Sequence, residues 1–358
     1  MKTIGREETS AIISYLVPLT SNLVPQIMEL KQLGNSSVKV TPLAFGAWAV
    51  GGWMWGGAEE KESTRAIRAS YELGMTTIDT APVYGFGKSE ELVAKAMEGV
   101  QRDRYQILTK FGMNWQTEQG EYFFDTTDNS GKPVKMYKYS GKEKVRQECE
   151  ESLRRLKTDY IDLLQIHWAD STTPISETMG EIAKLIKEGK VRVAGVCNYN
   201  VNQVDEALKT VNIVSNQVPY SMVHREIEKE IIPQAHTKGI GILPYSPLQR
   251  GVLTGKITVD YKFGEGDTRA DNRYYKPENL KRINAMLNKI RPIAETHNAS
   301  LSQLVINWTV HRPAMASVLV GARNEQQVKE NVNSLNFKLS NDEMNIITKA
   351  ADELVLVD

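Results

Sequence analysis

The chain has 358 residues, of which 41% are hydrophobic and 25% charged, a composition typical of globular proteins rather than disordered or fibrous ones. Its 44 basic residues balance its 44 acidic residues, so the composition gives no support for binding nucleic acid or an anionic membrane. The two cysteines, Cys149 and Cys197, cannot form a disulfide framework, and no apolar run is long enough to span a membrane. We therefore expect a cytoplasmic protein, because the cytoplasm keeps thiols reduced.

Residues 1–27 are expected to be an N-terminal extension outside the folded core. An apolar stretch at 11–19 resembles a short signal peptide. However, acidic residues precede it, Pro18 interrupts it, and no small-x-small cleavage site follows. The folded part is predicted to be a single domain covering residues 28–358.

From Leu43 to Ala322, short apolar segments rich in β-branched residues alternate with longer amphipathic ones, as expected for repeated βα units. Eight strands are predicted, at Leu43–Gly46, Thr76–Thr80, Tyr105–Lys110, Ile161–His167, Val193–Asn198, Val214–Gln217, Ile240–Tyr245 and Ser317–Gly321. Segments between them, such as Lys142–Lys157 and Thr178–Glu188, have one apolar helical face. Eight such units predict an α/β fold of the closed (β/α)8 TIM barrel type rather than an open doubly wound sheet.

Two long polar segments interrupt this alternation, Gly112–Gly141 after the third strand and Gln249–Asn279 after the seventh. Long loops of this kind are usually functional lids or disordered inserts. After the last strand, Asn324–Ser334 and Asn341–Glu353 predict two closing C-terminal helices. The chain ends at Asp358, so no long tail is expected to cover the mouth of the barrel.

Polar side chains stand at the C-terminal ends of three consecutive predicted strands, where TIM barrels carry their catalytic groups. Asp79, Lys110 and His167 end the second, third and fourth strands, and Tyr84 follows Asp79 by five residues. Each residue alone would more often be structural, but adjacent strands lie about 4.8 Å apart, so the four should converge. Lys110 would lower the pKa of Tyr84 and favour its phenolate, and Asp79 would be the counter-ion of Lys110. We predict that Tyr84 is a proton donor and that His167 orients a substrate oxygen.

The sequence also resembles the aldo-keto reductase superfamily over essentially all of residues 28–358. Seven segments match motifs of that family in the family's order: TIDTAPVYGFGKSEE, LTKFG, YIDLLQIHW, GVCNYN, NQVPYS, PYSPLQRGVLTGK and GARNEQQVKEN. The segment GAWAVGGWMWGG is similar to the bacterial branch of NADPH-dependent reductases of small aldehydes, within a wider group that includes potassium-channel β subunits. The resemblance implies that Asp79, Tyr84, Lys110 and His167 are a catalytic tetrad for the reduction of aldehydes and ketones.

The cofactor is expected to lie across the barrel mouth, because no Gly-x-Gly-x-x-Gly sits between a strand and a helix as a Rossmann site requires. The ends of the fifth to eighth strands offer Cys197, Asn198, Gln217, Tyr245 and the segment Gly321–Arg323. Asn198 and Gln217 can both donate to and accept from a carboxamide, and Tyr245 offers a flat face for a nicotinamide. Arg323, near a helix N-terminus, is suited to a phosphate and so favours NADPH over NADH.

The family resemblance places Asn198, Gln217 and Tyr245 on the nicotinamide and extends the cofactor site in both directions. It implies that the pyrophosphate meets Ser246, Leu248, Arg250 and Gly251, and that the adenosine is flanked by Gln327, Glu330 and Asn331. The family usually has Ser before this Asn, whereas this chain has Cys197. Because a thiol is a weak donor, the contribution of Cys197 to the carboxamide contact is left open.

Trp48, Trp53 and Trp55 follow the first strand and are predicted to line the mouth around a small aldehyde or ketone, although such a cluster can equally be packing. Trp168 and Asp170 are weaker candidates. The sequence does not indicate which carbonyl compound is the substrate or which oligomeric state the protein adopts. One alternative is an NADP-binding regulatory subunit like the channel β subunits, with slow residual chemistry. Another is a metal-dependent hydrolase, but only His167 among five histidines ends a predicted strand, so no metal site is expected.

Overall fold

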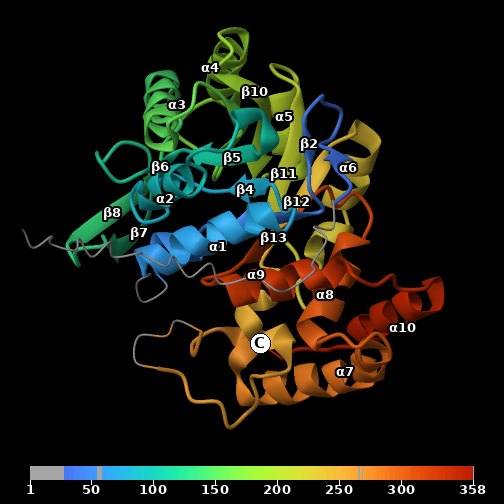
Figure 1. The fold of residues 1–358 in the computed structure, drawn as a ribbon. Helices are drawn as coiled ribbons and strands as arrows, with labels where there is room; N and C mark the ends of the chain where they lie inside the picture. The colour runs from blue at the N-terminus through green and yellow to red at the C-terminus, as the bar shows by residue number, and fades with distance from the viewer. Residues whose placement is uncertain (1–27, 55–58, 265–266, 268, 358) are drawn as a thin grey trace, which may run out of the picture.

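The computed structural model describes residues 28–54, 59–264, 267 and 269–357, and its centre is a sheet of eight parallel strands (Figure 1). In sheet order these are β12 (Gly241–Tyr245), β11 (Ile213–Pro219), β10 (Val191–Cys197), β9 (Ile161–Ile166), β5 (Gln106–Phe111), β4 (Thr77–Asp79), β3 (Leu43–Gly46) and β13 (Val318–Gly321). The edges meet where Ile242 N–H donates to the Ala314 carbonyl and Ala316 N–H donates to the Ile242 carbonyl, both at 2.9 Å. The predicted TIM barrel and its eight strands are confirmed.

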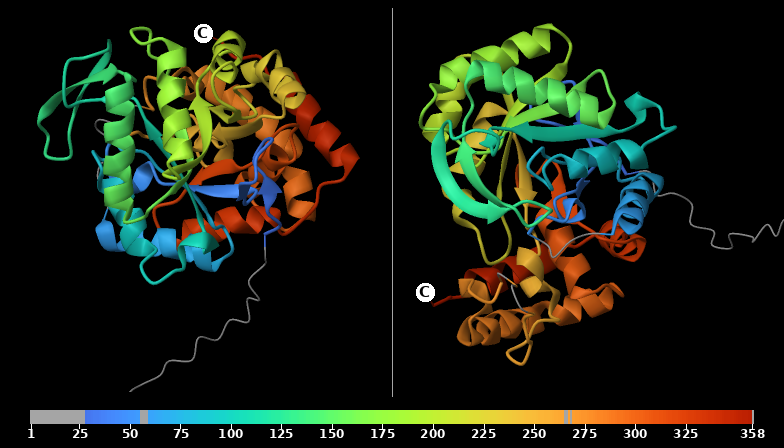
Figure 2. Two further views of the ribbon diagram at one scale, coloured as in Figure 1. Left: turned by 90° about the horizontal axis from the view of Figure 1, so that it is seen from above. Right: turned by 90° about the vertical axis from the view of Figure 1, so that its left-hand side faces the viewer.

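Helices surround the sheet, as the left view of Figure 2 shows. They are α1 (Glu60–Glu72), α2 (Lys88–Ala96), α3 (Lys142–Leu156), α4 (Ile175–Lys187), α5 (Val201–Leu208), α6 (Ile231–Lys238), α7 (Pro277–Thr296), α8 (Leu301–Val310), α9 (Glu325–Val332) and α10 (Asn341–Asp352). Helix α10 begins with a capping box, in which Ser340 and Glu343 satisfy each other's backbone N–H groups. The two closing helices expected from the sequence are therefore present as α9 and α10.

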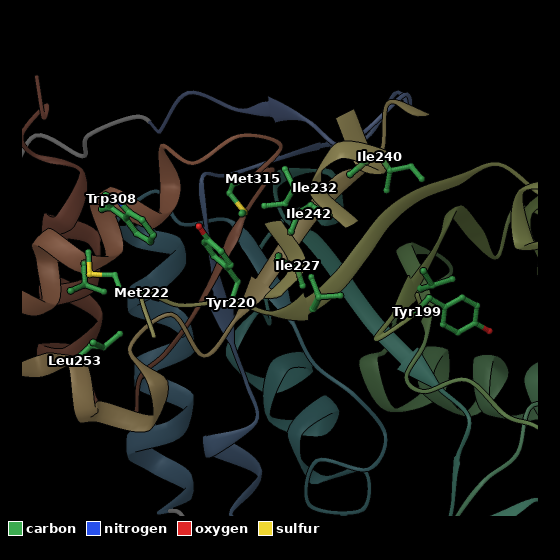
Figure 3. Close-up of a cluster of buried hydrophobic side chains, with 14 of the residues drawn as sticks. Tyr199, Tyr220, Met222, Ile227, Ile232, Ile240, Ile242, Leu253, Trp308 and Met315 are labelled. Atoms are coloured by element: carbon green, nitrogen blue, oxygen red, sulfur yellow. The ribbon is translucent and has the colours of Figure 1, made fainter. Parts of the chain in front are cut away.

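Helices α7 and α8 lie between β12 and β13 and were not predicted from the sequence. With α10 they gather on the side of the barrel opposite α3 and α4 (Figure 1). Helix α8 contributes Trp308, whose ring stacks on Tyr220 with centroids 6.0 Å apart, within a large apolar cluster between sheet and helices (Figure 3). The second predicted long loop consequently ends where α7 begins, at Pro277.

The segment after β5 is a small antiparallel sheet, where the sequence suggested a lid or a disordered insert. Its strands are β6 (Met113–Asn114), β7 (Glu121–Thr127) and β8 (Pro133–Lys138), in the order β6-β8-β7. We call β7, β8 and the turn between them the hairpin. The hairpin projects from the barrel beyond α2 (Figure 1). Its polar composition reflects one strand face in water, while Met136 on the other face is fully buried.

A second short pair, β1 (Lys31–Gln32) and β2 (Lys39–Val40), also escaped prediction, and it fills the N-terminal end of the barrel. Leu33, Val38 and Val40 pack there against inward-facing side chains of the strands, including Leu108 and Leu163. Apolar side chains thus fill the N-terminal end of the barrel, and the polar side chains lie at its C-terminal end, where TIM barrels bind their ligands.

The N-terminal extension predicted for residues 1–27 and Trp55 lie outside the described residues. Over the part of the chain that the structure does describe, no helix combines the length and the apolar character needed to cross a bilayer.

Candidate active site

Strand alternation brings the predicted catalytic residues to one end of the barrel. Leu108 and Leu163 belong to the interior cluster, so Lys110, two residues further along β5, and His167, four residues beyond Leu163, share that inner face. Asp79 ends β4, and in the sheet register it lies level with Leu108 of β5. The side chains of three neighbouring strands therefore converge at the C-terminal end.

Lys110 and Asp79 form a buried ion pair at the bottom of this end. Lys110 Nζ lies 2.6 Å from Asp79 Oδ1 and also donates to the Thr80 carbonyl at 2.9 Å. Burial alone would lower the pKa of Lys110, but the Asp79 carboxylate holds it above its ordinary value. Lys110 therefore keeps its positive charge in a place from which water is excluded.

Tyr84 lies directly above this pair. Lys110 Nζ is 4.8 Å from the centroid of the Tyr84 ring. Enclosure of the ring raises the pKa of Tyr84 to about 12, and the charge of Lys110 opposes that rise without cancelling it. The expected downward effect of Lys110 on the pKa of Tyr84 is present, but the expected net lowering is wrong, because the loss of hydration is the larger contribution.

His167 meets Tyr84 edge to face, with ring centroids 5.7 Å apart. Burial, and secondarily the charge of Lys110, lower the pKa of His167 well below its usual value. The imidazole is therefore neutral near pH 7 and carries a single ring N–H. A neutral donor and a protonated phenol side by side can both reach one substrate oxygen.

A cavity of about 610 Å³ opens above these residues and is lined by Asp79, Tyr84 and His167 at its base. Trp48, Trp53 and Trp168 line it as well. Asp170 has a different role, because its carboxylate accepts the Ser140 backbone N–H at 2.9 Å and so holds the chain just after β8.

The cavity has a second apolar wall that the sequence reading missed. Phe123 and Phe124 of β7 line it, together with Met113 of β6. Phe123 packs against Trp168 with centroids 5.4 Å apart, and Phe124 stacks on Trp53 at 6.3 Å. The adjacent phenylalanines were the available signal, since such a pair is unusual in a polar insert.

The side chains predicted to hold a nicotinamide lie next to Asp79 and His167, two of the predicted catalytic residues. Gln217 Nε2 donates to Asp79 Oδ2 at 2.7 Å, and within the described chain its amide oxygen accepts no hydrogen bond. Asn198 accepts from the Tyr245 hydroxyl at 3.0 Å and donates to the His167 carbonyl at 3.1 Å. All three residues line the cavity, whereas Cys197 is buried and does not.

The loop after β12 continues this lining through Ser246, Leu248, Arg250 and Gly251. Gln249, Arg250 and Gly251 have consecutive positive φ values of 46°, 53° and 103°. Tyr275 stabilises this unusual backbone by donating to the carbonyls of Gln249 and Arg250 at 2.8 and 3.0 Å. Backbone held in such conformations clusters at ligand sites, where it is imposed by surrounding contacts.

The far end of the cavity is formed where β13 meets α9. Gly321, Arg323, Gln327 and Asn331 line it, and Glu330, which is exposed on α9, does not. Asn331 Nδ2 donates to the Gly321 carbonyl at 3.1 Å, and Gln327 accepts the Arg323 backbone N–H at 2.9 Å. The Arg323 guanidinium is exposed beside the N-terminus of α9, an arrangement that attracts anions.

These groups fit an extended dinucleotide. The cavity is lined by the Asn198 and Gln217 amides and the Tyr245 ring at one end and by Arg323 at the other. The loop of residues 246–251 lines it between them. Within residues 28–54, 59–264, 267 and 269–357, no cluster of three or more His, Cys, Asp or Glu side chains is placed to bind a metal.

Comparison with known proteins shows what the chain is similar to. The model of the Aldo/keto reductase family matches residues 42–352. The chain is 35% identical to the aldo-keto reductase YhdN of Bacillus subtilis (strain 168), over 84% of this chain and 87% of that one. It is 32% identical to the NADH-specific methylglyoxal reductase of Escherichia coli (strain K12), over 90% and 98%.

A plant protein and a solved structure extend the comparison. A probable voltage-gated potassium channel subunit beta of Oryza sativa subsp. japonica is 30% identical, over 86% of this chain and 91% of its own. The structure of a glycerol dehydrogenase from Gluconobacter oxydans superimposes with a TM-score of 0.82 at 32% identity, covering 91% of this chain and 96% of that one.

Proposed function

Because the chain belongs to the aldo/keto reductase family, we propose that it reduces aldehydes and ketones to alcohols with NADPH, using Tyr84 as the proton donor. The observation that carries this proposal is the convergence of Tyr84, His167 and the buried Lys110–Asp79 pair at the base of one cavity. We further propose that residues 28–358 act as one domain, since every described site residue lies between Trp48 and Asn331.

Tyr84 has the properties of an acid that releases its proton only when charge develops on a substrate oxygen. A pKa of about 12 keeps the phenol protonated near neutral pH. Once the proton has moved, the nearby Lys110 ammonium stabilises the phenolate that remains. Asp79 acts through Lys110, because it keeps that ammonium charged and directed to one place.

His167 supplies the second contact to the substrate oxygen. Its neutral imidazole donates the ring N–H and polarises the carbonyl without competing for the proton that Tyr84 gives. The Asn198 amide donates to the His167 carbonyl, which fixes the backbone from which the imidazole projects.

A reduced nicotinamide, when bound, supplies the hydride. Gln217 would hold its carboxamide through the amide oxygen, because the amide nitrogen is already committed to Asp79. Tyr245 would stack on the ring, Ser246 to Gly251 would meet the pyrophosphate, and Arg323 would bind the phosphate that distinguishes NADPH from NADH. The relative in Escherichia coli is named NADH-specific, so the preference requires a direct test.

The substrate is proposed to be a small aldehyde or ketone, held against the aromatic side chains that line the cavity, namely Trp48, Trp53, Phe123 and Phe124. The test is oxidation of NADPH and of NADH by the purified protein, followed by fluorescence with a panel of carbonyl compounds. Turnover with NADPH and at least one carbonyl supports the proposal. Equal use of both cofactors would show that Arg323 does not select NADPH over NADH.

A second candidate function is a regulatory subunit that binds NADP and retains slow chemistry, and the similarity to the rice channel subunit supports it. The same panel separates the two functions. Cofactor binding without turnover of any aldehyde or ketone would favour the regulatory function over the enzymatic one.

A further inference from the structure

The segment that carries Tyr84 has a backbone conformation that glycine adopts freely but that Phe86 does not favour. The three residues that follow Tyr84, namely Gly85, Phe86 and Gly87, have φ values of 68°, 56° and 99°. Glycine adopts such values freely, but a phenylalanine does so only at a conformational cost. A backbone of this kind persists only where surrounding contacts impose it.

The barrel itself supplies part of that constraint. A Cβ atom at Gly51 would lie 2.7 Å from the Tyr84 carbonyl carbon, and one at Gly85 would lie 2.2 Å from the Gly51 oxygen. The turn after β3 therefore presses directly on the Tyr84 peptide. This contact and the bond from the Ser89 N–H to the Tyr84 carbonyl at 3.1 Å hold the segment from the side of the barrel.

The hairpin supplies a further constraint. Asn129, in the turn between β7 and β8, donates from Nδ2 to the Gly85 carbonyl at 3.0 Å. The Phe86 ring packs edge to face on Trp115, which directly follows β6, and on Trp53, at 5.4 and 5.8 Å between centroids. Trp53 Nε1 in turn donates to Thr126 Oγ1 of β7 at 3.1 Å. Each hydrogen bond joins the hairpin to a segment that lines the catalytic end.

We propose that the hairpin fixes the proton donor, and that Asn129 is a positioning residue that holds the strained Tyr84 segment against the turn after β3. This inference rests on the proposed function, since it assigns Asn129 to the geometry of the Tyr84 proton transfer. Asn129 is exposed and does not line the cavity, so it acts through its hydrogen bond to Gly85.

The test compares Asn129→Ala, which removes the donor, and Asn129→Asp, which keeps the shape but cannot donate, with Ser130→Ala. Ser130 is the matched control, because it lies in the same turn and its hydroxyl donates to Asp128 Oδ1 at 2.6 Å rather than to the Tyr84 segment. Hydrogen–deuterium exchange of residues 81–89 is measured on the full chain without cofactor. Steady-state reduction, its pH profile and the stoichiometry of NADPH binding are measured on the same proteins.

Both Asn129 variants should exchange faster at residues 81–89 and lose roughly tenfold in kcat, because a small misplacement of a reacting group is costly. Their decline in reduction at high pH should begin at a lower pH, since a looser Tyr84 is better hydrated. NADPH stoichiometry should stay at the wild-type value, and Ser130→Ala should match the wild type throughout.

Unchanged exchange in both Asn129 variants would overturn the proposal, and so would faster exchange with wild-type kcat and pH profile. If the wild type turned over no carbonyl compound, the proposed function would fail. The exchange data would then still decide whether Asn129 holds the Tyr84 segment.

Discussion

Lys110 and Asp79 form an ion pair at 2.6 Å in which the two side chains are 0% and 2% exposed. The second oxygen of Asp79 accepts from Gln217, so the carboxylate joins the ammonium below Tyr84 to an amide that faces the cavity. Such a pair is expensive to disturb, because removing one partner leaves the other charge unpaired and without water.

Tyr84→Phe should remove most carbonyl reduction and leave NADPH binding nearly intact. Only the hydroxyl is lost, and general acid catalysis contributes roughly a hundred- to ten-thousand-fold to rate. Steady-state kinetics measure kcat, and quenching of protein fluorescence measures the NADPH dissociation constant. Full turnover by the variant would show that another group is the acid.

Lys110→Met should abolish turnover and also destabilise the protein, by about 3–5 kcal/mol, because Asp79 is left as a buried unpaired charge. The double variant Lys110→Met with Asp79→Leu should recover much of that stability but none of the activity. Urea unfolding of the three proteins measures the free energies. Equal stability of the wild type and Lys110→Met would mean that the pair is hydrated in solution.

The pH dependence of reduction should be flat through neutrality. Tyr84 must be protonated to donate, and with a pKa of about 12 it remains so until strongly alkaline pH, where the rate should decline. His167 should add no break near pH 6.5, because its pKa is held well below that value and it stays neutral. The profile of kcat/KM for a carbonyl substrate checks both points, and a break near pH 6.5 that His167→Gln removes would contradict the second.

Glu148 should make the protein less stable as pH rises toward neutrality. Burial on α3 raises the pKa of this carboxyl to about 7, although Gly112 N–H donates to it at 3.0 Å. The folded state therefore binds the proton more tightly than the unfolded state does. Stability from this proton is full below about pH 4.5 and is lost as pH rises through about 7.

Glu148→Gln should flatten this dependence between about pH 5 and 7, an effect on the order of 1–3 kcal/mol. Urea unfolding at a series of pH values provides the measurement, with Glu143→Gln at an exposed position of the same helix as the control. Parallel pH curves for the wild type and Glu148→Gln would show that another group is responsible.

Arg323→Ala should weaken the binding of NADPH but not that of NADH. Loss of a charge-assisted contact to a phosphate corresponds to roughly a ten- to hundredfold rise in the dissociation constant for NADPH. Binding of NADH should change little. Lys329→Ala on the exposed side of α9 controls for a general loss of positive charge, and similar weakening of both cofactors by Arg323→Ala would contradict the assignment.

Much of the barrel could be predicted, because the apolar periodicity of each strand and helix is visible in a short segment of the sequence. The predicted strand Leu43–Gly46 has the same bounds as β3, and the other strands differ by a few residues at most. The hairpin was not predicted, because only one of its faces is buried and that burial depends on contacts with Trp53 and Trp168. The local sequence pattern does not indicate that these distant tryptophans will cover one face of the hairpin.

The sequence by itself determined which polar residues stand at the strand ends, since a parallel barrel brings all those ends to one face. Only the tertiary structure decided their protonation, because a pKa depends on how far water is excluded, and exclusion at Tyr84 outweighs the charge of Lys110. The tertiary structure alone also joined Asn129 to Gly85, 44 residues apart along the chain. Contacts between distant segments arise from packing, and no local periodicity encodes them.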